Sequence, residues 1–153
     1  MEKHFEILRK TRNFLLSIIN ELSPAQLNQV PEGFNNNVAW NFGHVIAAQQ
    51  GVCYKRAGLP MVIEEELFTR FKPESKPEGI VGENEIESLK SLLLSTIDDL
   101  EADYKAGKFN GYKPWTTRYG VQIDTIEDAI SFLSFHDGLH VGYVMALRRA
   151  LKN

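Results

Sequence analysis

The sequence predicts an all-α protein in which residues 1–153 form a single domain, a four-helix bundle with long loops. Four segments of the 153-residue chain repeat apolar side chains every three or four residues, which is the period of an amphipathic helix. All prolines and most glycines fall outside these segments, so strands are expected at most in the loops. Four helices that each present one apolar face can bury those faces against one another, which favours a bundle.

The first two helices are expected at about Glu2 to Leu22 and at about Asn37 to Ala57. Ser23 and Pro24 end the first helix and start a short turn, because serine is a good N-cap and proline is tolerated at the first helical position. Asn37 is the expected N-cap of the second helix, and Gly58 ends that helix.

The third and fourth helices are expected at about Asn84 to Ala106 and at about Thr125 to Lys152. Thr125 and Asp128 stand at the positions of a capping box, with Asp in place of Glu. The connection Gly107 to Asp124 is expected to contain a short hairpin or an extended lid. We expect this connection and the earlier one, Gly58 to Glu83, to include the most mobile backbone, because both are long and broken by glycine and proline.

Composition excludes several classes of function. The chain is 43% hydrophobic and 24% charged, with a formal net charge of −3 and no long basic run, which argues against nucleic acid as the main partner. No apolar run approaches the 18 residues of a membrane span, and the N-terminus lacks the pattern of a signal peptide. Cys53 is the only cysteine and cannot form an internal disulfide, which fits a reducing compartment, and we expect a cytoplasmic protein.

Two histidines stand in the middle of the apolar stripe of the last helix. His136 and His140 are four residues apart, so their rings lie about 40° apart around the helix, one turn above the other. Such a pair can clamp one metal ion. His44, on the apolar side of the second helix, could supply a third nitrogen, whereas His4 lies at the N-terminus. Three neutral imidazoles leave positions open on the metal, for which Zn²⁺ or Ni²⁺ would be suitable.

Other interpretations of the same residues stay open at this stage. Hydrogen-bonded core histidines would give the same spacing, which alone does not separate them from metal ligands. A zinc-protease helix would need Glu where Asp137 stands, a di-iron bundle needs Glu three residues before a histidine, and paired haem ligands would crowd each other. Asp137 lies about 100° around the helix from His136, so we interpret it as a solvated or N–H-bonded acid and only a weak candidate for supporting the site. Cys53 lies on the helix face opposite His44.

Two motifs carry a resemblance to a known family. Residues Val38 to Val45 read VAWNFGHV and residues His136 to Gly142 read HDGLHVG, and the LRRAL ending follows. In this order and separation they resemble the signatures of the second and last helices of the DinB/YfiT-like superfamily. The resemblance implies a four-helix bundle, often dimeric, that binds a divalent metal through one histidine of the second helix and two of the last, here His44, His136 and His140.

The resemblance also implies a chemistry. Characterised relatives include S-transferases and isomerases that use low-molecular-weight thiols. We therefore expect a metal-held thiolate that attacks an electrophilic small molecule. Trp115, Tyr119, Phe68 and Phe71 could line its pocket, although aromatic residues in such loops more often pack in a core or a lid. A metal-dependent hydrolase and a non-catalytic metal-binding or sensing module remain alternatives, since no residue is clearly a general base.

Overall fold

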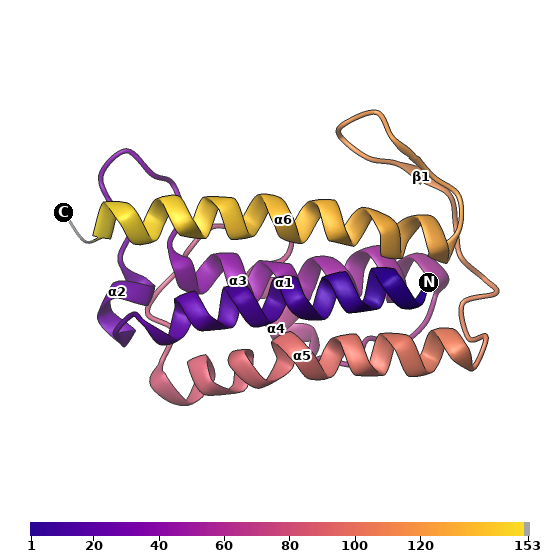
Figure 1. The fold of residues 1–153 in the computed structure, drawn as a ribbon, viewed down its shortest axis with the longest axis horizontal. Coiled ribbons are helices and arrows are strands. Elements are labelled where there is room, and N and C mark those ends of the chain that lie inside the picture. The colour runs from indigo at the N-terminus through magenta and orange to yellow at the C-terminus, as the bar shows by residue number, and fades with distance from the viewer. Residues whose placement is uncertain (152–153) are drawn as a thin grey trace.

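Four long helices lie side by side along one common direction (Figure 1). The fold is described from a computed structural model over residues 1–151, so Lys152, the expected end of the last helix, lies outside the described residues. The long helices are α1 (Glu2–Asn20), α3 (Val38–Gln49), α5 (Glu83–Lys105) and α6 (Ile126–Leu151). The predicted all-α four-helix architecture is confirmed. Over the described residues, the helices are all too short or too polar to cross a bilayer.

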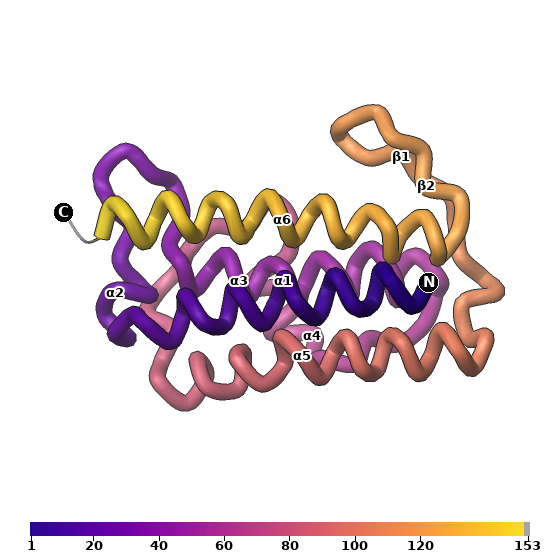
Figure 2. The backbone as a smooth tube through the Cα atoms, in the orientation of Figure 1, coloured from indigo at the N-terminus to yellow at the C-terminus, as the bar shows by residue number. Residues whose placement is uncertain are grey.

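A short antiparallel hairpin precedes α6, as expected. Its strands are β1 (Trp115–Thr116) and β2 (Gln122–Ile123), and Trp115 pairs with Ile123. Figure 2 shows the hairpin as a loop that projects beside α6. The capping box of α6 is also present, since the Asp128 carboxylate accepts from the Thr125 backbone N–H at 3.0 Å and the Thr125 hydroxyl accepts from the Asp128 N–H at 3.2 Å.

The second helix changes its winding halfway along. The expected α-helix to Ala57 stops at Gln49, and a π-helix, η1 (Gln50–Lys55), continues it. Gln49 and Gln50 are both fully buried, on two sides of the helix: the Gln49 amide donates to the Thr96 carbonyl at 2.6 Å, and the Gln50 amide oxygen accepts from the Val62 N–H at 3.0 Å. π-turns within α-helices are rare and are found frequently at functional sites.

The connection expected as one long loop between the second and third helices contains a packed helix. α4 (Glu65–Phe71) lies against α3 through its two phenylalanines, Phe68 and Phe71, which are 8% and 1% exposed. Gly43 permits this contact, because a Cβ atom there would lie 2.6 Å from the Phe71 ring. The sequence analysis missed α4 since it spans only two turns between proline-rich stretches. A further short helix, α2 (Pro24–Asn28), begins with the expected Ser23 cap.

Replacing Gly43 by alanine tests this packing. The added methyl group would lie 2.6 Å from two carbons of the Phe71 ring, so the ring and α4 must shift, and we expect Gly43→Ala to lower the free energy of unfolding by about 1–3 kcal/mol. Gly51→Ala is the matched control. Its Cβ atom would meet Phe68, which also belongs to α4, at an ordinary contact distance of 3.4 Å. Chemical denaturation measures both, and equal stability of the two variants would contradict the close approach.

Candidate metal centre

Three histidines from two helices meet at one point in the bundle. His44 comes from α3, and His136 and His140 come from α6. Their ring centroids are 4.6 to 5.3 Å apart, and one nitrogen of each ring lies within 4.8 Å of the others. The sequence analysis named these three residues, and the fold brings all of them together. His4, the fourth histidine, is not part of this group.

Backbone and ring contacts hold His44 in place. Its Nδ1 atom lies 2.7 Å from the Phe71 carbonyl oxygen, which can only accept a hydrogen bond, so Nδ1 carries the proton and Nε2 keeps a free lone pair. The Trp40 ring stacks on the imidazole at 4.6 Å, and the Trp40 indole N–H donates to the Ser75 hydroxyl at 2.9 Å. The segment after α3 therefore orients a histidine on α3.

A buried amide orients His140 in the same way. The Asn41 side-chain nitrogen donates to the Asn37 carbonyl at 2.8 Å, so its oxygen is left to accept from His140 Nδ1 at 2.9 Å. Asn41 is 1% exposed and was missed in the sequence, although an asparagine on an otherwise apolar helix was a visible signal. Two of the three rings thus present Nε2 to the common point.

The imidazoles of His44 and His140 are neutral at pH 7. Burial lowers the pKa of His44 to about 4, against the opposing effect of its hydrogen bond to the Phe71 carbonyl. Burial also lowers the pKa of His140 to about 3, aided by the nearby rings of His136 and His44. Neutral imidazole is the form that ligates a metal ion, so these rings need not lose a proton in order to bind one.

Asp137 is a buried, N–H-bonded acid, which is the second of the two environments expected for it. It is 1% exposed, and its Oδ2 atom accepts from Arg12 Nε at 2.8 Å. Its Oδ1 atom lies 3.5 Å from His136 Nδ1 and has no hydrogen-bond partner within residues 1–151. Burial opposes ionisation of Asp137, but Arg12 and the neighbouring His136 together outweigh it and hold the pKa of the carboxyl below its ordinary value. The third histidine therefore also has an acceptor behind its Nδ1 atom.

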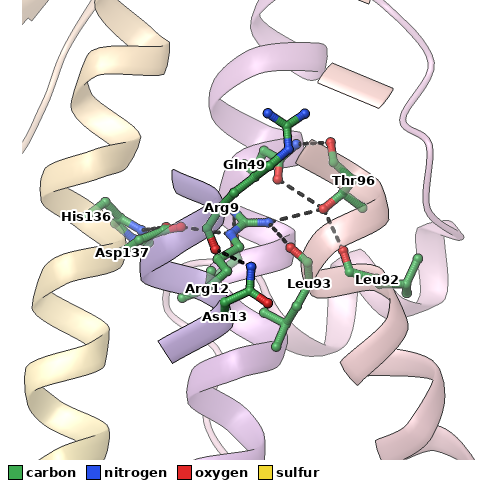
Figure 3. Close-up of polar contacts among 10 residues, drawn as sticks. Arg9, Arg12, Asn13, Gln49, Leu92, Leu93, Thr96, His136 and Asp137 are labelled. Carbon is green, nitrogen blue, oxygen red and sulfur yellow. Dashed lines mark hydrogen bonds and ion pairs between the residues drawn. The ribbon is translucent and has the colours of Figure 1, made fainter. Parts of the chain in front are cut away.

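Arg12 of α1 is completely buried and reaches three other helices (Figure 3). Besides its ion pair with Asp137 of α6, it donates to the Thr96 hydroxyl and the Leu93 carbonyl of α5 at 3.1 Å each. A longer contact of 3.4 Å reaches the Val45 carbonyl of α3. Arg12 sits on the apolar stripe of α1 and was not among the residues predicted for the site.

The protein comparisons agree with this geometry. The family model of the DinB superfamily matches residues 7–144, most of the chain and both histidine motifs. The chain belongs to the DinB superfamily. A search of curated proteins finds no significant match.

The histidines of this DinB-superfamily protein open onto a pocket of about 980 Å³. Of the four aromatic residues proposed for its walls, Phe68, Trp115 and Tyr119 line it, whereas Phe71 is buried beneath Gly43. Phe132 and Trp40 were missed as wall residues. Cys53 is not on the lining: it lies fully buried in the core, where burial raises the pKa of its thiol.

Removing one partner of the buried ion pair should be costly. Asp137→Asn leaves the Arg12 charge buried without a counterion, so we expect the free energy of unfolding to fall by about 3–5 kcal/mol. Arg148→Gln, which breaks the partly exposed pair with Glu21, should cost less than about 1 kcal/mol. Chemical denaturation compares the two, and a loss for Asp137→Asn as small as that for Arg148→Gln would show that the buried pair is not a major constraint.

Proposed function

We propose that this DinB-superfamily protein is a divalent-metal-dependent enzyme whose metal ion is held by His44, His136 and His140. One observation carries the proposal: three imidazoles converge on one point, the Nδ1 atoms of His44 and His140 each lie within hydrogen-bond distance of an oxygen acceptor, and the Asp137 carboxylate lies 3.5 Å from His136 Nδ1. Backing of histidine ligands by such acceptors is the usual support of a metal site. Zn²⁺ or Ni²⁺ suits an all-imidazole ligand set.

The chemistry we propose is thiol-dependent S-transfer to an electrophilic small molecule. A divalent ion with open positions would lower the pKa of a low-molecular-weight thiol bound to it. The thiol would then be present as the nucleophilic thiolate. The pocket has room for a thiol and an electrophile together, and aromatic side chains, among them Trp40 and Phe132, line it. A new C–S bond forms, the leaving group departs with the electrons of the bond that breaks, and the thiol proton goes to solvent water. Thiol chemistry and a single cysteine fit a cytoplasmic location.

Metal content tests the ligand set directly. His44→Ala, His136→Ala or His140→Ala should each sharply lower the metal bound per chain while most of the helix content remains, because two imidazoles make a much weaker site than three. Elemental analysis of protein purified without a histidine tag gives the occupancy, and circular dichroism gives the helix content. His4→Ala and Cys53→Ala are controls that should keep the metal. Unchanged metal content in His136→Ala would show that the pair are ordinary core histidines.

The same samples test the reaction. Metal-loaded protein should accelerate the loss of a chlorinated or epoxide electrophile only when a thiol is present, and His136→Ala should abolish the acceleration. Thiol-independent cleavage of ester or amide substrates would instead indicate a metal-dependent hydrolase. Full metal occupancy without turnover of either substrate class would indicate a metal-binding or sensing module.

We also propose a homodimer that forms through the outer face of α6. The exposed positions of this face over four turns carry no charged side chain and are Ser131, Phe135, Gly138, Leu139, Gly142, Met145 and Ala146. A Cβ atom at either glycine would meet nothing within 4 Å, which leaves room for a second helix to approach closely. A face of this kind pairs with its own copy around a twofold axis.

A charge placed on this face should weaken the dimer. We expect Met145→Glu to shift the protein toward the monomer in sedimentation equilibrium, because two like charges would face each other across the twofold axis. Ala102→Glu, on the exposed side of α5, is the control and should leave the mass unchanged. A wild-type protein that stays monomeric at micromolar concentration, or a Met145→Glu variant that dimerises as well as wild type, would contradict the proposed interface.

A further inference from the structure

The charged residues that line the pocket are mostly basic. They are Lys55, Arg56 and Arg118, against one carboxylate, Glu74, among the described residues. The chain as a whole is acidic, with 20 Asp and Glu against 17 Lys and Arg. The charge around the pocket is therefore opposite in sign to that of the protein, which would concentrate anions at its mouth.

Two of these basic residues have no internal counterion. Within residues 1–151 the guanidinium groups of Arg56 and Arg118 make no ion pair with a carboxylate, whereas Arg12 and Arg70 are each paired with one. Instead they lie over aromatic rings, Arg56 at 4.8 Å from the Trp115 centroid and Arg118 at 5.4 Å from the Tyr119 centroid. Stacking of this kind restricts a guanidinium but leaves its N–H donors free.

The hairpin turn fixes Arg118 at the pocket. The Thr117 N–H donates to the Val121 carbonyl and the Gly120 N–H donates to the Thr117 carbonyl, each at 2.9 Å, and Gly120 has the positive φ of +80° that this turn requires. The Tyr119 ring then packs edge-on against Phe135 of α6 at 5.3 Å. Arg118 is thus part of a hydrogen-bonded turn that contacts, through Tyr119, the helix that carries two of the three histidines.

Arg118 lines the same pocket as all three histidines of the site, His44 on α3 and His136 and His140 on α6. One exposed residue of the hairpin therefore borders the same cavity as both helices that carry the site.

We infer that the pocket recognises a substrate whose apolar body carries a carboxylate or phosphate group, and that Arg118 binds this anionic group with support from Arg56. A guanidinium presents two parallel N–H groups that match the oxygens of either anion. The aromatic walls formed by Trp115 and Phe132 would pack against the apolar body and strengthen the ionic contact by excluding water. The inference rests on the proposed function, since it names the substrate class of that same pocket.

Three small probes of similar shape test the inference: phenylacetate, phenyl phosphate and neutral phenylacetamide. Calorimetric titration should show that wild-type, metal-free protein binds one or both anions more tightly than the amide, and that added salt weakens the difference. Arg118→Gln should weaken anion binding about ten- to hundred-fold, as expected for the loss of a charge-assisted hydrogen bond, and Arg56→Gln should weaken it less. Whichever anion binds more tightly identifies the group that the substrate carries.

Arg149→Gln is the matched control, since Arg149 is an exposed arginine of α6 that does not line the pocket. It should leave anion binding unchanged, and Arg118→Gln should keep the wild-type metal content. The inference is overturned if phenylacetamide binds as tightly as the anions, if neither anion binds at millimolar concentration, or if Arg118→Gln binds them as wild type does. The probes are titrated into metal-free protein, so the two proposals can fail separately. If the histidine variants keep their metal content, the metal proposal fails, but Arg118→Gln can still weaken anion binding. If the wild-type protein binds its metal fully but Arg118→Gln binds the anions as wild type does, only this inference fails.

Discussion

The fold of this DinB-superfamily protein and its candidate metal centre depend on one buried ion pair. Arg12 and Asp137 are 0% and 1% exposed, so neither charge could be accommodated without the other. The hydrogen bonds from Arg12 to Thr96 and Leu93 fix the position of the guanidinium, and they do so only when α1, α5 and α6 are in register. Asp137 follows His136 directly, and its second oxygen faces the Nδ1 atom of that histidine. The group that balances the buried charge therefore also supports the site.

Each histidine of the cluster is supported by a different part of the chain. The Phe71 carbonyl at the end of α4 supports His44, the Asn41 amide of α3 supports His140, and Asp137 supports His136. α4 is short, but its last residue has two roles. The Phe71 ring packs in the core, and the Phe71 carbonyl oxygen accepts a hydrogen bond from His44. A rearrangement of α4 should consequently disturb both stability and the orientation of His44.

The regular and irregular parts of the structure contribute differently to function. The helices supply the three histidines, and all three lie within the residues that the superfamily model matches. Tyr119, Trp115 and Arg118 on the hairpin, together with Glu74 after α4, supply much of the pocket wall and two of its four charged residues. Glu74 is the only non-glycine residue within residues 1–151 that has a positive φ, of 69°. A fold does not fix a substrate, and here the segments outside the long helices are the ones that would select it.

The sequence by itself determined the four long helices, the N-caps at Ser23 and Asn37, the hairpin, and the identity of the three histidines. These features depend on residues that are close in sequence, or on a motif that a family shares, and so periodicity and spacing reveal them. Only the tertiary structure decided that Arg12 is a buried partner of Asp137, that the second helix turns into a π-helix at Gln50, and that Arg118 reaches the pocket. These features depend on which groups meet across the bundle, because the burial of a charge or the widening of a turn is set by the neighbouring elements and leaves no local period in the sequence.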